Sequence, residues 1–215
     1  VMPLYDACSA APPVVQPASV SPITALFGVW RQWDSCWYER IAARGYEPGS
    51  IGVAFFPLFP MAMRIVALLL GGNVAAAGYV VAGAGYIAAM VGLYRLAWRD
   101  FDETIARRAV LALSVFPSAL ALFIPYTESC FLALAIWTIS LARRGNWWWA
   151  AALAFLAILT RTQGCLLALP LAWEVWQQRH QCATIWARIW RVALVAGAPL
   201  GGLGLFLGCS WAALG

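Results

Sequence analysis

Long apolar segments follow a shorter, more polar N-terminal region, and this change is the dominant pattern along the chain. Six segments are rich in Ala, Leu, Val, Ile and Trp, and they span residues 74–98, 109–125, 129–141, 147–160, 165–176 and 192–215. A helix needs about 20 apolar residues to cross a bilayer, and several of these segments reach that length only with their aromatic flanks. The pattern predicts an all-α, polytopic membrane protein with about six transmembrane helices.

Segment 57–72 differs from these six because it is short and carries a charge. It begins with Pro57 and Pro60, and a crossing would place Arg64 within the hydrocarbon. Burying an arginine there costs about 2.5–3.5 kcal/mol on insertion scales. We therefore predict that this segment forms a helix lying at the membrane surface.

The domain organisation follows from these spans. Residues 1–32 hold five prolines and little periodicity, which favours an extended segment. We predict one membrane domain over residues 1–215, with a non-cytoplasmic loop bearing amphipathic helices in residues 1–73 and a transmembrane helix bundle in residues 74–215. The sequence begins without Met and stops inside an apolar run, so we expect a fragment of a longer protein.

Composition agrees with this class. Hydrophobic residues make up 63% of the chain and charged residues 11%, whereas a soluble domain has about 25% charged residues. All the basic residues are Arg, which points weakly to a GC-rich bacterial genome, and nothing indicates a nucleic-acid partner. The six cysteines form no CxxC pair and no ligand spacing with His180, so we predict no metal or cofactor and expect the cysteines to pack as small apolar groups.

The arginines predict the orientation. With segment 57–72 left at the surface, nine of them fall on one side of the membrane: Arg95, Arg99, Arg107, Arg108, Arg143, Arg144, Arg179, Arg188 and Arg191. The positive-inside rule makes that side cytoplasmic. Residues 33–60, 125–129 and 161–163 then face the opposite compartment, and Trp147, Trp148 and Trp149 form an inner aromatic belt.

The first polar cluster on the outer face surrounds Asp34. Trp33, Trp37 and Ile41 recur at every fourth residue, which predicts an amphipathic helix over residues 33–44. Its aromatic side is expected on lipid, with Asp34 toward water or a site. The alternative is an aromatic belt with Asp34 as a solvated charge at a helix start.

The other two clusters surround Glu128 and Arg161. Pro117 and Pro125 break the chain before Glu128, and broken backbone at membrane depth is tolerated where it lines a cavity, so we expect Glu128 to point into a pocket. The alternative is a helix cap. Arg161 suits bidentate recognition of a phosphate at the membrane surface, and the alternative is an interfacial arginine that snorkels.

These segments occur in an order that resembles a known family. WDSCWYERIAARGY, AFFPLFP, FPS, PYTES and LTRTQG follow one another within residues 33–174. This set is similar to the PIG-V type mannosyltransferases and their bacterial relatives, in the GT-C class of lipid-linked glycosyltransferases. The chain departs from the family in lacking a span before Trp33 and the C-terminal spans, which fits a fragment.

The resemblance implies a donor of polyprenyl- or dolichyl-phosphate mannose or a related sugar, a lipid or glycan acceptor, and transfer on the non-cytoplasmic face. The expected location is the bacterial plasma membrane, or the endoplasmic reticulum in eukaryotes, whose members add the second mannose of the GPI anchor. Asp34 is the expected base of an inverting transfer. The expected substrate-binding residues are Trp33, Tyr38, Phe56, Pro57, Tyr126, Glu128, Arg161 and Gln163.

Two other classes of function stay open. A transporter also places charged residues near broken helices, but it favours paired halves with matching interruptions, and the chain shows none. A non-catalytic membrane scaffold would tolerate the loss of Asp34, whereas the enzyme would not.

Overall fold

The computed structural model describes residues 34–47, 51–181 and 184–214, and within these ranges all regular structure is helical. The α-helices are α3 (Asp34–Arg44), α4 (Leu58–Leu69), α5 (Val74–Asp100), α6 (Glu103–Val115), α7 (Glu128–Arg143), α8 (Trp147–Ile158), α9 (Ala168–Gln177) and α10 (Ile185–Leu214). Four 3₁₀ segments join them: η1 (Ile51–Ala54), η2 (Pro117–Leu122), η3 (Thr162–Leu167) and η4 (Gln178–Gln181). The all-α prediction is confirmed.

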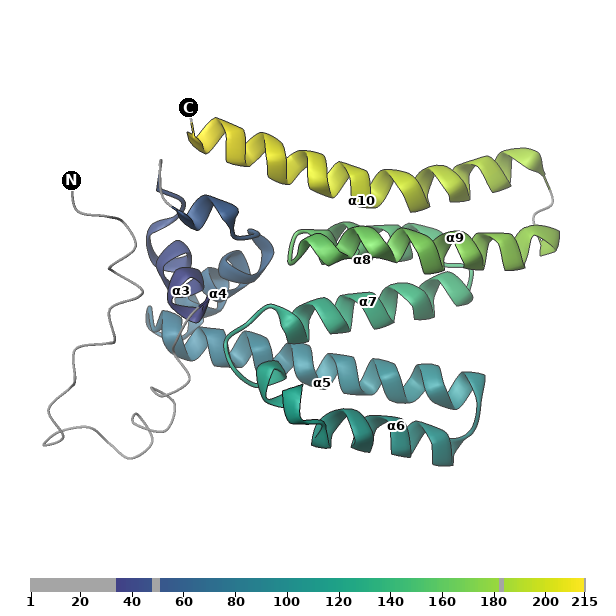
Figure 1. Ribbon diagram of the computed structural model, residues 1–215, viewed down its shortest axis with the longest axis horizontal. Helices are drawn as coiled ribbons and strands as arrows, with labels where there is room; N and C mark the ends of the chain where they lie inside the picture. The colour runs from purple at the N-terminus through teal and green to yellow at the C-terminus, as the bar shows by residue number, and fades with distance from the viewer. Residues whose placement is uncertain (1–33, 48–50, 182–183, 215) are drawn as a thin grey trace, which may run out of the picture.

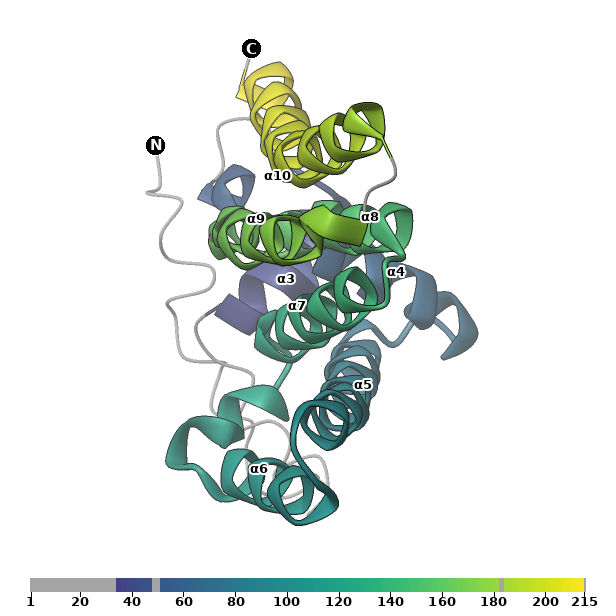
Figure 2. The ribbon, with the colours of Figure 1, turned by 90° about the vertical axis from the view of Figure 1, so that its right-hand side faces the viewer.

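The helices from α5 to α10 run back and forth between two ends of an elongated bundle (Figure 1). Viewed along the bundle, α5, α7 and α8 occupy the centre, with α6 and α10 on opposite sides (Figure 2). We call the end that holds α3, α4 and the start of α7 the α3 end. The distal end is where α5 and α7 finish and α8 begins.

Within the described residues, length and composition identify two helices that can cross a membrane. They are α5 and residues 189–208 of α10, and only about a fifth of each apolar stretch is buried inside the protein (22% and 17%). At 1.5 Å per residue, the 27 residues of α5 extend about 40 Å, whereas the 12 residues of α8 extend about 18 Å.

Several of the predicted spans are therefore shorter or more broken than the sequence suggests. Segment 109–125 is divided because α6 ends at Val115, and Pro117 then starts a 3₁₀ segment. Segment 165–176 begins in η3 and becomes α-helical at Ala168. Most of these helices are too short to cross a membrane alone. Six crossings would therefore require short helices and the 3₁₀ segments beside them to cross together.

Close packing of α5 on α7 depends on small residues spaced by seven. A Cβ atom built on Gly85 would lie 2.9 Å from the backbone nitrogen of Cys130, and one on Gly92 would lie 2.9 Å from Trp137 Nε1. The Trp137 indole donates to the Ala88 carbonyl at 3.0 Å across this interface. Glycine removes the side-chain barrier, so the two helix backbones approach closely, as is common where helices pack in lipid.

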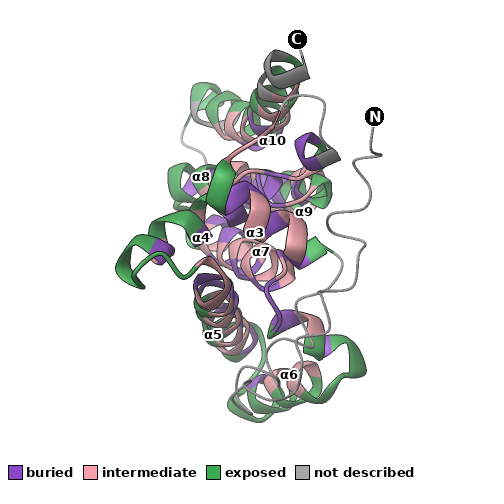
Figure 3. Cartoon of the chain, turned by 90° about the vertical axis from the view of Figure 1, so that its left-hand side faces the viewer, coloured by how far each residue is buried: buried purple, intermediate pink, exposed green. Residues whose placement is uncertain are grey.

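Helices α3 and α4 dock on the start of α5 through a shared core. Tyr38, Phe59 and Met63 are all at most 7% exposed, and the Tyr38 ring meets Phe59 edge-on at 5.1 Å. Figure 3 shows α3 and α4 at this end of the molecule, with α3 partly or fully buried over most of its length. On the side of α3 that was expected to face lipid, Ile41 is buried, and Trp37 is half-buried and stacks on Phe55 at 5.9 Å.

The cysteines also differ from expectation. Cys36 on α3 is disulfide-bonded, so it is not simply a small apolar group. Cys130 and Cys165 are free thiols, as expected of packing residues.

Candidate functional site

Asp34 is the first residue of α3 and lies at the surface of the α3 end. Its helix is held in place by Tyr38 one turn later, whose ring sits in the core described above. An acidic residue in the first turn also complements the helix dipole. The fold thus presents the Asp34 carboxylate at a rigid helix start.

Glu128 is the first residue of α7, and the loop before it is seated firmly on α5. Pro125 is fully buried, and a Cβ atom on Gly78 would lie 2.9 Å from the Pro125 Cβ. The Thr127 side chain, 2% exposed, shares a hydrogen bond with the Tyr38 hydroxyl. Thr127 does not cap α7 with its side chain, so this threonine links the loop to α3.

Arg161 lies in the turn between α8 and η3. A Cβ atom on Gly164 would lie 2.5 Å from the Ile158 backbone, so only glycine lets this turn fold back on α8. The hydroxyl of Thr160 donates to the Ala157 carbonyl at 2.6 Å, and the Leu58 amide donates to the Leu159 carbonyl at 3.0 Å. The turn is therefore fixed both to α8 and to the start of α4.

These three segments bring Asp34, Glu128 and Arg161 together. Arg161 Nη1 forms an ion pair with Glu128, and both side chains remain about one-third exposed (31% and 33%). Asp34 interacts electrostatically with both residues. Within the part of the chain that the structure describes, Asp34 makes no ion pair of its own, so one arginine serves two carboxylates.

The pKa of Asp34 is raised above its usual value of 3.8. Partial burial is the largest cause and repulsion by Glu128 the second, while Arg161 acts in the opposite direction. A carboxylate that is more basic than usual can accept a proton more readily. Asp34 therefore has the electrostatic character of a base.

Two tyrosines border the same charges. Burial raises the pKa of Tyr38 and of Tyr126 to about 12, and Asp34 and Glu128 add to both shifts. Both phenols are protonated near neutral pH, as a tyrosine with its ordinary pKa also is. They provide hydroxyl groups beside the carboxylates without adding charge.

Of the remaining predicted site residues, two lie near Arg161 and one packs in the core. Gln163 lies beside Arg161 and accepts from its Nε at 3.4 Å, and Pro57 precedes α4 next to the Leu159 turn. Phe56 is 8% exposed and stacks on Phe206 of α10 at 3.9 Å, so its side chain packs in the core instead of reaching the charges. Trp33 lies outside the described residues.

Sequence reasoning passed over two residues that shape this site. Thr127 belongs to the PYTES motif, but the sequence does not predict its contact with Tyr38, because no local pattern links two residues so far apart in the chain. Gly164 belongs to the LTRTQG motif, and the structure explains why this position is glycine: its backbone approaches the Ile158 backbone too closely for a Cβ atom. Among the described residues, no group of three His, Cys, Asp or Glu side chains is arranged to hold a metal ion.

The distal end carries its own charged cluster. Arg143 forms ion pairs with Asp100 and with Glu174, the latter at 2.8 Å from its Nε, and it joins the ends of α5, α7 and α9. Arg99 adds a bond to the Arg143 carbonyl at 3.1 Å. A cavity of about 540 Å³ also opens at this end, far along the bundle from Asp34.

Comparison of the chain with protein-family models, with curated proteins and with solved structures finds no match.

Proposed function

We propose that this protein is a multi-pass membrane glycosyltransferase that moves mannose or a related sugar from a polyprenyl- or dolichyl-phosphate donor to a lipid or glycan acceptor. The observation that carries the proposal is the assembly of Asp34, Glu128 and Arg161 from three separate segments at one end of an apolar bundle. These are the segments whose motifs resemble the PIG-V type mannosyltransferases.

The arrangement of the helices supports a membrane location with six crossings. Helices α5 to α10 alternate in direction between the two ends (Figure 1). Many large apolar side chains on them are exposed, such as Leu111, Leu200 and Leu207. Helix α4 runs across the α3 end and exposes Ile65, Leu68 and Leu69, which suits a helix lying in the membrane surface.

The disulfide at Cys36 supports a non-cytoplasmic position for the α3 end. Disulfides persist in oxidising compartments such as the bacterial periplasm or the lumen of the endoplasmic reticulum. Cys36 lies two residues from Asp34, so the candidate site faces the same compartment. The arginine-rich distal end then faces the cytoplasm.

The chemistry needs one base and one anion-binding group. The oxygen of the acceptor hydroxyl attacks the anomeric carbon of the sugar, and Asp34 accepts the proton that this hydroxyl loses. The bond from that carbon to the lipid phosphate breaks, and the phosphate oxygen keeps the electron pair. Inversion at the anomeric carbon follows from this single displacement.

Arg161 is suited to hold the departing phosphate. A guanidinium has five N–H donors in a planar fork, and Glu128 occupies only part of it. Glu128 therefore acts as a positioning residue that orients Arg161 while the remaining donors face the substrate. Tyr126, which is partly exposed, offers a neutral hydroxyl to sugar or phosphate oxygens, whereas the buried Tyr38 hydroxyl holds Thr127 in place.

The test is transfer from radiolabelled polyprenyl-phosphate mannose into lipid by membranes that contain the protein or its Asp34→Asn variant. Asn keeps the size of the side chain but accepts no proton, so transfer falls by roughly 100-fold or more. Glu39→Gln on the same helix is the matched control, and it keeps full activity. Equal transfer by the protein and by Asp34→Asn would remove the proposed base and favour the scaffold.

A further inference from the structure

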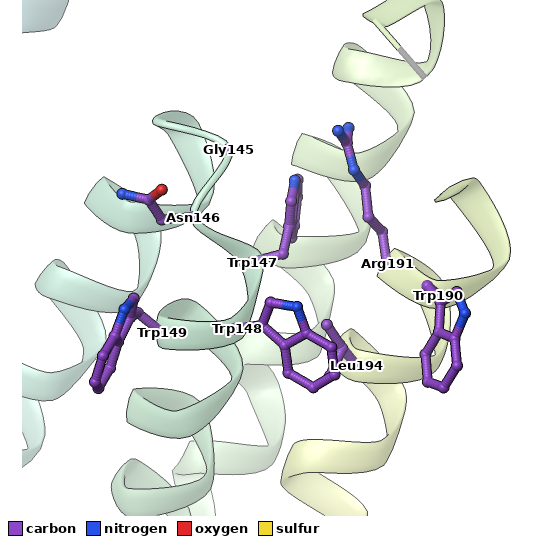
Figure 4. Close-up of a pocket in the computed structure, with 8 residues that line it drawn as sticks. All are labelled: Gly145, Asn146, Trp147, Trp148, Trp149, Trp190, Arg191 and Leu194. Atoms are coloured by element: carbon purple, nitrogen blue, oxygen red, sulfur yellow. The ribbon is translucent and has the colours of Figure 1, made fainter. Parts of the chain in front are cut away.

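The cavity at the distal end lies between the start of α8 and the first turns of α10 (Figure 4). Its lining includes Asn146, Trp147, Trp148, Trp149, Trp190 and Arg191, and its volume is about 540 Å³. This size falls within the range of small-molecule binding sites. A row of interfacial tryptophans needs no such hollow, so an aromatic belt does not account for it.

Two buried donors in the cavity lack acceptors. Trp147 is 6% exposed, and its indole N–H has no hydrogen-bond partner among the described residues. Arg191 Nη1 is also buried and has none there. The Arg191 guanidinium lies over the Trp147 ring at 5.4 Å, and Figure 4 shows both nitrogen-bearing ends pointing the same way.

Unsatisfied donors of this kind carry a free-energy cost unless something binds them. The described lining residues include no Asp or Glu, so none of them supplies a counter-charge to Arg191. The start of α8 adds to the attraction, because the Asn146 side chain does not cap it and a helix N-terminus favours anions. An acceptor with negative charge therefore fits the cavity.

The rim of the cavity is apolar. Trp148 and Trp190 face each other with ring centroids 6.3 Å apart, and they are 69% and 60% exposed. Such rings suit the glycerol and upper acyl region of a lipid, with the phosphate at the depth of the donors. Arginine and an indole N–H together match the oxygens of a phosphate group.

We infer that this cavity is a binding site for a phosphate group carried by an anionic membrane lipid, held by Arg191 and Trp147 and flanked by Trp148 and Trp190. The site is separate from Asp34 and does not depend on the proposed sugar transfer. Because α8 and α10 meet there, an occupied site holds the two helices together at the distal end.

The test is native mass spectrometry of the purified chain in neutral detergent, titrated with phosphatidylglycerol, with diacylglycerol and with inorganic phosphate. Phosphatidylglycerol binds, and Arg191→Gln weakens its binding about tenfold, as expected for the loss of a charge-assisted hydrogen bond. Arg179→Gln is the matched control, because Arg179 also lies over a tryptophan, Trp176, at 4.3 Å but outside the cavity. It leaves the affinity unchanged.

A second variant separates binding from folding. Incorporation of 3-benzothienylalanine at position 147 keeps the size and shape of the Trp147 ring system and replaces only the N–H by sulfur, so it weakens phosphatidylglycerol binding severalfold without lowering the melting temperature. Saturable binding of inorganic phosphate that depends on Arg191 would identify a free anion as the source of the phosphate. Equal binding of diacylglycerol and phosphatidylglycerol, unaffected by either variant, would overturn the inference.

Discussion

The two ends of the bundle carry the same charged groups in different arrangements. At the distal end, Arg143 bonds directly to both Asp100 and Glu174. At the α3 end, Arg161 pairs with Glu128 alone, and Asp34 lies within electrostatic reach without an ion pair among the described residues. One arginine and two carboxylates thus form a closed cluster at one end and an incomplete one at the other.

This difference distinguishes charges that stabilise the fold from charges that can take part in chemistry. A carboxylate bonded to a guanidinium has its charge neutralised and its lone pairs occupied, so it contributes to packing and not to proton transfer. Among the described residues the Asp34 carboxylate, whose pKa is raised, forms no ion pair, and Arg161 keeps N–H donors that neither Glu128 nor Gln163 uses. Composition alone would have ranked the two clusters equally.

Removing each arginine gives the sharpest test of this contrast. Arg161→Gln lowers kcat/KM for sugar transfer by about 100-fold, as expected when a donor to the developing charge is lost. Arg143→Gln leaves kcat/KM within about threefold, because no substrate group contacts it. Both are measured in the same radiolabelled transfer assay. A loss of activity in Arg143→Gln as large as in Arg161→Gln would abolish the contrast.

Stability responds in the reverse order. Arg143→Gln leaves two partly buried carboxylates side by side and lowers the free energy of unfolding by about 1–3 kcal/mol, discounted for the exposure of the side chains. Arg161→Gln costs about 1 kcal/mol or less, since Glu128, its ion-pair partner among the described residues, is one-third exposed. Thermal unfolding in detergent measures both, and equal losses would contradict the closed cluster at the distal end.

The helical fold class and the three charged segments could be predicted from the sequence because they depend on local patterns. The prolines before Glu128 and the aromatic spacing near Asp34 can be recognised from neighbouring residues alone, without knowledge of contacts between distant parts of the chain. That spacing predicts a helix over residues 33–44, and the described part of this helix is α3, Asp34–Arg44.

Other features depend on contacts between distant residues. Phe56 stacks on Phe206 of the last helix, and no local pattern reveals that pairing. The aromatic side of α3 was expected on lipid because an amphipathic pattern shows which face is apolar and not what covers it. The cavity at Arg191 was missed for the same reason, since α8 and α10 bring its donors together only in three dimensions.

Packing of α5 on α7 positions Glu128, and two glycines on α5 test it. Gly85→Ala places a methyl group 2.9 Å from the Cys130 backbone, and the resulting overpacking destabilises the protein by about 1–3 kcal/mol. Gly83→Ala is the matched control because a Cβ atom there meets nothing within 4 Å, so it is neutral or stabilising by up to about 1 kcal/mol. Chemical unfolding in micelles compares them. Equal stabilities would mean that the two helices are not in close contact.

The smallest effect concerns the pH dependence of transfer. Asp34 must be ionised to act as a base, so kcat/KM falls as the pH drops through its pKa, and this limb lies at higher pH than for an ordinary aspartate. Glu128→Gln removes the repulsion that raises the Asp34 pKa, so the limb moves to lower pH, whatever happens to the maximum rate. Arg161→Gln removes an attraction that lowers the pKa, so the limb moves to higher pH. Glu103→Gln, near the distal end, leaves the limb in place, because its charge is far from Asp34. Profiles of kcat/KM against pH for the four proteins decide the matter, and a limb that moves upward in Glu128→Gln would show that a group other than Asp34 is titrating.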